Sequence, residues 1–138
     1  MKLLALVVLL FGPCNLLFAQ SQLEVVVTGI KNGEGDIRVG IFSDKETFLK
    51  KAVYGKVVEA KEGSIKVIIE LEKGVYGVSV IHDENKNGDL DSSFIGIPRE
   101  GFGFSNNAMG TFGPPRFEKA SITVENGKMS ISIAMKYL

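Results

Sequence analysis

An oxygen-rich loop lies in the stretch HDENKNGDLD, which runs from residue 82 to residue 91. Side chains that carry oxygen recur there at every second position around one glycine. Calcium takes six to eight oxygen ligands, and a short loop supplies them when alternate side chains turn inward around a tight bend, which glycine permits. The spacing fits the first nine positions of the calcium loop D-x-[DN]-x-[DN]-G. The predicted calcium ligands are Asp83, Asn85, Asn87, the carbonyl of Asp89, and Asp91.

The loop departs from the EF-hand pattern at its twelfth position, where Phe94 stands in place of the bidentate glutamate. No helical pattern flanks it, so we interpret it as a calcium loop placed between two strands, with Glu100 as the nearest carboxylate that could complete the ligand shell. Because only two of the side-chain ligands carry a formal charge, the expected Kd is weak, about 10⁻⁴–10⁻³ M. Two alternatives stay open, an unmetallated turn rich in Asn and Asp and a site for another hard cation.

A catalytic reading depends on His82, because it is the only histidine of the chain. In a small hydrolase, His82 and the neighbouring carboxylates would be the catalytic groups. The sequence, however, offers no nucleophile paired with a base. A lone histidine at the end of a strand is more often a packed structural residue. We therefore expect a protein that is not an enzyme.

Apolar residues alternate with polar ones through most of the chain, which is typical of strands with one buried face. Residues 23–30 and 36–42 are predicted to form a hairpin through Asn32-Gly33, and Asn126-Gly127 gives a second hairpin signal. Ser43, Asp44 and Glu46 resemble a capping box, which predicts one or two helical turns over 43–52. Further strand-like runs cover 56–62, 64–72, 75–83, 117–126 and 127–138.

Seven short strands with one short helix predict an all-β fold, an antiparallel seven-stranded β-sandwich of immunoglobulin-like or transthyretin-like type. A closed barrel is the alternative. There is no internal repeat and no linker, so residues 20–138 are expected to form a single domain.

A long irregular region covers residues 92–116, and it is rich in glycine and asparagine yet contains four phenylalanines. Loops of this length inside a small domain tend to be functional or packed on themselves. One interpretation is that the phenylalanines are buried and plug one end of the sandwich. The other is a contact loop for a ligand, whose residues would be Glu100, Phe102, Phe104, Ser105, Asn106 and Asn107.

The first nineteen residues have the basic start, apolar run and small-residue end of a secretory signal peptide, with cleavage expected after Ala19. Gly12, Pro13 and Asn15 interrupt the apolar run, which disfavours the alternative of a retained membrane anchor. Cys14 follows Pro13, so lipidation is not expected, and the mature chain would contain no cysteine. We expect an exported protein, periplasmic or secreted, without a transmembrane segment.

Lysine plus arginine and aspartate plus glutamate both number 16, so the formal net charge is zero. A protein that binds nucleic acid through its phosphates would carry an excess of positive charge. Nucleic acid is therefore not an expected partner.

The motifs around the long loop resemble the bacterial family known as domain of unknown function 2141. The matching residues are Asp83 to Asp91, then Gly96, Pro98, Glu100, Gly101 and Gly103 to Ala108, then Pro115, Phe117 and Ala120. The resemblance implies an exported sandwich related to transthyretin-like and carboxypeptidase-regulatory-like domains, without an established activity. From the residues themselves we expect a binding or structural module whose partner is an unknown protein or glycan at the cell envelope. A carbohydrate-binding or adhesion module is the alternative.

Overall fold

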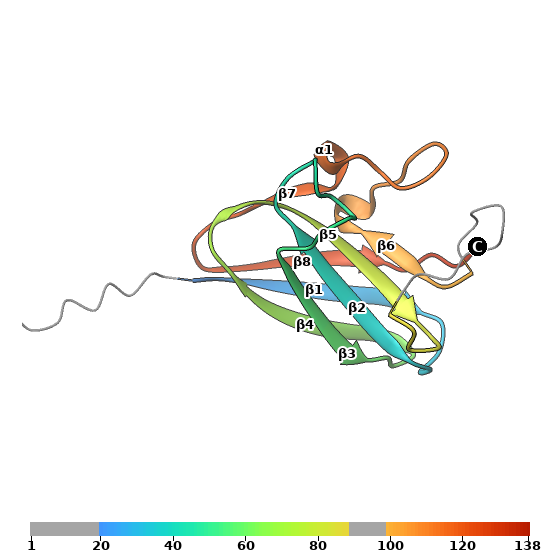
Figure 1. Cartoon of the computed structure of the whole chain (residues 1–138). Helices are drawn as coiled ribbons and strands as arrows, with labels where there is room; N and C mark the ends of the chain where they lie inside the picture. The colour runs from blue at the N-terminus through green and yellow to red at the C-terminus, as the bar shows by residue number, and fades with distance from the viewer. Residues whose placement is uncertain (1–19, 89–98) are drawn as a thin grey trace, which may run out of the picture.

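The computed structural model describes residues 20–88 and 99–138, which form two β-sheets with two short helical turns (Figure 1). The predicted signal peptide with Cys14, and three residues of the acidic region, Asp89, Asp91 and Phe94, lie outside the described residues. The elements in chain order are β1 (Ser21–Ile30), β2 (Asp36–Phe42), β3 (Tyr54–Glu59), β4 (Gly63–Leu71), β5 (Gly74–Asp83), β6 (Phe102–Phe104), the 3₁₀ turn η1 (Ser105–Asn107), α1 (Phe117–Ala120), β7 (Ser121–Val124) and β8 (Lys128–Ala134).

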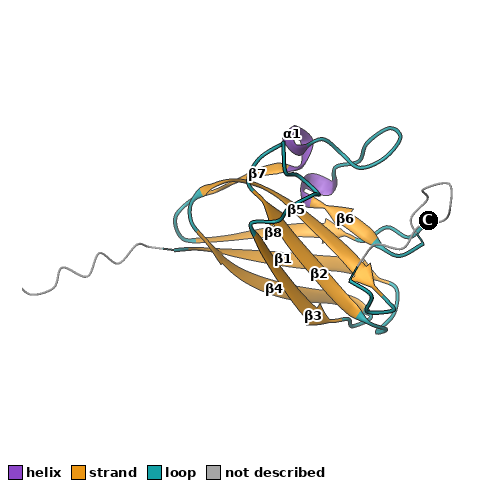
Figure 2. Cartoon of the chain, in the orientation of Figure 1, coloured by secondary structure: helices purple, strands orange, loops and turns teal. Residues whose placement is uncertain are grey.

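The strands belong to a three-stranded sheet in the order β4-β1-β8 and a larger sheet in the order β3-β2-β5-β6, with β7 paired to β5. All pairs are antiparallel except β1 and β8, which run parallel. The all-β prediction is confirmed. The strands form two sheets, and not the closed barrel that was the alternative. The prediction of seven antiparallel strands is wrong, because the described residues contain eight strands and one sheet is mixed. Figure 2 shows how strands dominate the chain.

The main core lies between the two sheets, and the alternation read from the sequence supplies it. In β1, Leu23, Val25 and Val27 are fully buried while the residues between them are partly exposed. In β5, Val78, Val80 and His82 are fully buried and lie at alternate positions. Period-two burial of this kind is the main stabilising feature of a sandwich, because each inward side chain removes apolar surface from water.

Both predicted hairpins are wrong. β1 pairs with β4 and β8, whereas β2 pairs with β3 and β5, so residues 31–35 carry the chain from one sheet to the other. Asn126-Gly127 also joins two sheets, because β7 pairs with β5 and β8 pairs with β1. Glycine-rich turns mark where a chain reverses direction, but hydrogen-bond partners are decided by long-range packing.

The predicted helical turns over 43–52 are replaced by a run of turns. Asp44 caps this segment as expected, since its Oδ1 accepts hydrogen bonds from the backbone N–H and the hydroxyl of Thr47, at 2.9 and 2.8 Å. The segment does not continue as a helix, because Leu49 takes a positive φ of 62°. Phe48 anchors it by packing edge-on against Phe42 and Phe117, at centroid distances of 5.3 and 5.6 Å. The short helix forms at α1 instead.

A second apolar cluster covers the outer face of the larger sheet. It contains Phe42, Phe48, Phe102, Phe104 and Ala120. The two phenylalanines of β6 lie opposite Ser79 and Ile81, which alternate along β5 with core residues. The interpretation that phenylalanines of the long region are buried is thus confirmed for this pair, although they cover a face of the sheet and do not plug an end.

The two sheets are also joined where both have an open edge. β3 and β4 end their respective sheets, and the Nζ of Lys56 on β3 donates a hydrogen bond of 2.7 Å to the carbonyl of Ile68 on β4. A lysine at an edge discourages pairing with another chain.

No helix of the described residues is long and apolar enough to cross a membrane.

Candidate functional site

The acidic loop begins at Asp83, the last residue of β5, whose side chain is fully buried. Its Oδ2 accepts hydrogen bonds from Arg38 Nε at 2.9 Å and from the backbone N–H of Gly88 at 2.8 Å. Its Oδ1 accepts the backbone N–H of Asn87 at 3.1 Å. β2 brings Arg38 to this point because Asp36 on the same strand is in register with Asp83. One carboxylate therefore organises the loop and joins it to the sheet.

The electrostatic environment of Asp83 favours the ionised carboxylate. Burial on its own would raise its pKa, because the anion loses contact with water. The N–H groups of Gly88 and Asn87 and the guanidinium of Arg38 stabilise the anion by more than this, and the pKa lies below its ordinary value. Asp83 is thus ionised at neutral pH, as a ligand of a hard cation must be.

The backbone of the loop makes the tight bend that the glycine predicted. Lys86 and Gly88 have positive φ values of 58° and 86°. Asn85 supports the bend, since its Oδ1 accepts the N–H of Asn87 at 3.2 Å. The structure thus brings three of the predicted side-chain ligands, Asp83, Asn85 and Asn87, into one compact turn.

Glu100 lies against this turn, although sixteen residues separate it from Glu84. Its side chain is buried, with a residue exposure of 5 %, and its Oε2 accepts the backbone N–H of Glu84 at 2.6 Å. The predicted proximity of Glu100 to the loop is therefore found. Among residues 20–88 and 99–138, no three or more His, Cys, Asp or Glu side chains gather into a group that could hold a metal.

The segment between β1 and β2 packs directly on the loop. Gly35 has a φ of 67°, and a Cβ at this position would lie 2.0 Å from the carbonyl oxygen of Asp83 and 2.6 Å from that of Glu84. No other residue type fits such a gap between two stretches of backbone. Gly35 is therefore required for the contact between this segment and the acidic loop.

His82 forms a buried network next to the loop. Its Nε2 lies 2.6 Å from the carbonyl of Glu34, and its Nδ1 lies 2.8 Å from the hydroxyl of Tyr137. A carbonyl only accepts, so in the neutral ring Nε2 carries the hydrogen and Nδ1 accepts the proton of the tyrosine. The Tyr137 hydroxyl in turn accepts the N–H of Lys31 at 3.1 Å. His82 thereby ties the C-terminal residues to the segment that packs on the acidic loop.

Burial also affects the tyrosine of this network. Removal from water raises the pKa of Tyr137, and the nearby Glu84 carboxylate raises it further, while the hydrogen bond from Lys31 opposes this. Tyr137 therefore stays protonated at neutral pH and remains a hydrogen-bond donor to His82.

The residues predicted as a contact loop are used mainly inside the fold. Four of them, Glu100, Phe102, Phe104 and Ser105, are buried. The Ser105 hydroxyl accepts the N–H of Val78 at 2.9 Å and donates to the carbonyl of Ala120. These four side chains are positioned to hold the loop together, and they do not present a surface to a ligand.

The two asparagines of the predicted contact loop are exposed, but their amides bind backbone. Asn106 Nδ2 donates to the carbonyls of Lys119 and Ser121, at 3.1 and 2.9 Å. Asn107 Oδ1 accepts the N–H of Ala134 at 2.9 Å. Together with Ser105 they join β5, α1, β7 and β8 at one point. The polar groups read as ligand contacts are therefore bound within the fold.

Three residues that matter here were not singled out from the sequence. Arg38 looked like an ordinary outward residue of an alternating strand, and Tyr137 like a residue near the chain end. Phe112 is fully exposed, whereas the other described phenylalanines are buried or partly buried. The glycines and prolines around Phe112 could have signalled a projecting loop, but nothing local could have paired Arg38 or Tyr137 with their partners.

Comparison with known proteins gives one result. The family model described as "Uncharacterized protein conserved in bacteria (DUF2141)" matches residues 25–132. This range contains the acidic loop, Glu100 and the Ser105–Asn107 turn. No curated protein and no solved structure matches the chain.

Proposed function

We propose that this chain, which belongs to the bacterial family DUF2141, is an exported, non-enzymatic β-sandwich module that binds a calcium-type cation at residues 83–91. The cation would serve a binding or structural role at the cell envelope. Its ligands would be Asp83, Asn85, Asn87, the carbonyl of Asp89, and Asp91, with Glu100 close by.

The observation that carries this proposal is the state of Asp83. A buried, ionised carboxylate at the first position of the loop accepts the N–H groups of the fifth and sixth positions, Asn87 and Gly88. These bonds hold the chain in a bend around which side-chain oxygens can converge. The oxygen-only donor set suits calcium, a hard cation that takes carboxylate, amide and carbonyl oxygens.

Glu100 adds a second argument. It is buried beside the loop and comes from the far side of the long connection between β5 and β6. Burial of carboxylates is costly unless positive charge or hydrogen bonds compensate. A divalent cation near Asp83 and Glu100 would add to the stabilisation that Arg38 and the backbone N–H groups already give these carboxylates.

Arg38 shapes the expected affinity. Its guanidinium already pairs with Asp83 at 2.9 Å, so the loop keeps its bend without a cation. The bound ion would share Asp83 with a fixed positive charge, which weakens binding by Coulomb repulsion. A Kd of about 10⁻⁴–10⁻³ M is in keeping with this and with the millimolar calcium found outside cells.

The arrangement of His82 supports a role without catalysis. Its side chain is fully buried, and its two ring nitrogens are engaged by the Glu34 carbonyl and the Tyr137 hydroxyl. A general base needs an accessible lone pair within reach of a substrate proton. His82 is therefore better suited to stabilising the fold.

Thermal unfolding of the protein of residues 20–138 tests the proposal, with calcium, with magnesium and with a chelator. A specific ligand of the native state raises the melting temperature with its concentration. We expect a rise with millimolar calcium, a smaller one with magnesium and no rise with chelator. Glu100→Gln should reduce the calcium effect, whereas Glu118→Gln at the other end of the molecule should leave it unchanged. Equal melting temperatures in all three conditions would reduce the loop to a structural turn.

A further inference from the structure

The connection between η1 and α1 forms a loop that stands away from the two sheets (Figure 1). Phe112 lies within it and is completely exposed, at 101 % of its reference surface, and Met109 is also exposed. A phenylalanine in water costs free energy that burial would recover. Among the described large apolar side chains, Phe112 is the most exposed.

The loop is held in shape from within. A Cβ on Gly110 would lie 2.5 Å from the carbonyl oxygens of Gly113 and Pro114, so the two arms of the loop run in direct contact. Pro115 is buried at its base, and Asn106 fixes that base through the carbonyls of Lys119 and Ser121. Ordering the loop therefore costs little when Phe112 binds, because most of its conformational freedom is already lost.

Basic residues outnumber acidic ones in two segments on the α1 side of the molecule. The run of turns at 43–51 lies at the same end of the molecule as α1, since Phe48 packs on Phe117. The exposed basic residues of the first segment, and of α1 with its N-cap residue, are Lys45, Lys50, Lys51, Arg116 and Lys119. The same segments contain three acidic residues, Asp44, Glu46 and Glu118. These two segments thus contain more basic than acidic residues, in a chain with no net charge overall.

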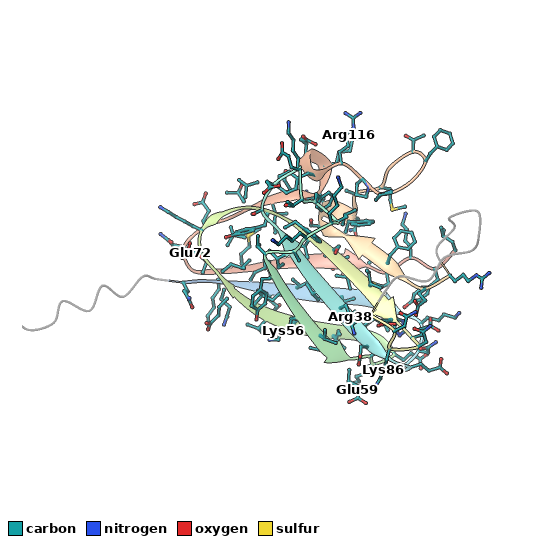
Figure 3. All side chains as sticks on the ribbon, viewed as in Figure 1. Arg38, Lys56, Glu59, Glu72, Lys86 and Arg116 are labelled. Atoms are coloured by element: carbon teal, nitrogen blue, oxygen red, sulfur yellow. The ribbon has the colours of Figure 1, made fainter. Side chains whose placement is uncertain are left out.

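The acidic loop lies at the opposite end. Along the pair of β2 and β5, Asp36 is in register with Asp83 at one end and Phe42 with Gly77 at the other. Figure 3 shows Arg116 beside α1, at the far end of the molecule from Lys86 and Glu59. The two ends of the molecule therefore differ, with the carboxylates of the acidic loop at one end and, at the other, α1 with its basic residues and the connection that leads to it.

We propose that the Phe112 end seats on an anionic lipid surface, with the ring inserted among the upper acyl chains and the lysines and arginine facing the headgroups. A specific protein interface buries about 800 Å² on each partner, which one ring and one methionine on a narrow loop do not supply. A bilayer interface accepts a single ring. Each basic residue near an anionic surface adds a further favourable contribution to the free energy of binding. Contact through this end leaves the acidic loop facing away from the membrane.

A tryptophan reporter tests this directly, because the chain has no tryptophan. The protein of residues 20–138 contains every described element of the fold, and Phe112→Trp gives it one fluorophore at the loop. With phosphatidylglycerol vesicles we expect its emission to shift to shorter wavelength and to be quenched by brominated acyl chains. Leu138→Trp is the matched control, because Leu138 is 74 % exposed and follows Tyr137, which is bound to His82 beside the acidic loop. Its emission should not change.

Cosedimentation of the unlabelled protein gives the magnitude. Phe112→Ala should lower the vesicle partition coefficient about tenfold, the effect of withdrawing one phenylalanine from an apolar environment. The double variant Arg116→Gln/Lys119→Gln should lower it about tenfold on phosphatidylglycerol. Phosphatidylcholine vesicles should bind weakly in every case. All these positions are exposed, and matching circular dichroism melts will show that the variants fold.

Three results would overturn the proposal. Unchanged emission of Phe112→Trp at saturating phosphatidylglycerol would show that the ring does not enter the bilayer. Equal binding to phosphatidylcholine would show that the basic residues do not recognise anionic lipid. A shift that grows with protein concentration in the absence of lipid would identify a protein partner, a second copy of the chain, as the true contact of Phe112.

Discussion

Removal of the Tyr137 hydroxyl tests the network that anchors the C-terminal residues beside the acidic loop. In Tyr137→Phe the ring can keep its place, but the donor to His82 Nδ1 at 2.8 Å is lost. His82 is fully buried, so this nitrogen would be left without a hydrogen-bond donor from the fold. An unsatisfied buried polar atom costs about 1–3 kcal/mol.

The second bond of the hydroxyl contributes less. The N–H of Lys31 belongs to an exposed residue, so water can replace the tyrosine oxygen there. The expected loss is therefore about 2 kcal/mol of the free energy of unfolding, which for a domain of this size lowers the Tm by roughly 6–12 °C.

Urea unfolding at neutral pH, followed by circular dichroism, measures this loss. Tyr54→Phe is the control, because Tyr54 is 43 % exposed on the edge strand β3, and a change within about 0.5 kcal/mol is expected there. If Tyr137→Phe is as stable as the Tyr54 control, His82 does not depend on the tyrosine, and the network does not stabilise this end of the molecule.

Two further predictions concern the acidic loop. Gly35→Ala should be far more destabilising than Gly63→Ala in the same unfolding assay, because both glycines have positive φ but only at Gly35 would the new Cβ meet backbone. Gly63→Ala should lower the free energy of unfolding by on the order of 1 kcal/mol. Equal losses in the two variants would contradict the close packing at Gly35. Asp83→Asn should be less stable than the native protein at neutral pH. Since the folded pKa of Asp83 is lowered, its contribution is present above the unfolded pKa and is lost as pH falls through the folded value. The difference between the two proteins should therefore shrink below about pH 4, and a constant difference across the acid range would refute this role.

Much of the fold could be predicted from local pattern, and the failures have one physical cause. Alternation predicted strands with one buried face, which β1 shows, because period-two spacing fixes which side chains share a face. His82 was expected to be a packed residue, and it is fully buried. The turn at Asn32-Gly33 was located correctly, yet its strands pair in different sheets. Pairing depends on residues far apart in the chain, such as Val25 with Val67, and no local signal encodes it.

The acidic loop shows the same division between local and distant information. Its bend at Gly88 could be read from composition, because glycine at such a position implies positive φ. Glu100 was found by proximity in sequence. Arg38 could not be found, since it reaches Asp83 only through the register of β2 and β5. Local sequence also does not predict which phenylalanines are buried. Phe104 and Phe112 both stand in glycine-rich stretches, yet Phe104 is buried and Phe112 is exposed.

Titration calorimetry tests most directly whether residues 83–91 bind calcium. Calcium added to the protein of residues 20–138 should give one site with a Kd of about 10⁻⁴–10⁻³ M. Asp91→Asn should weaken binding at least about tenfold through the loss of a charged ligand, whereas Glu118→Gln should not alter it. Absence of binding heat at millimolar calcium, or equal binding by the Asp91→Asn protein, would contradict the account.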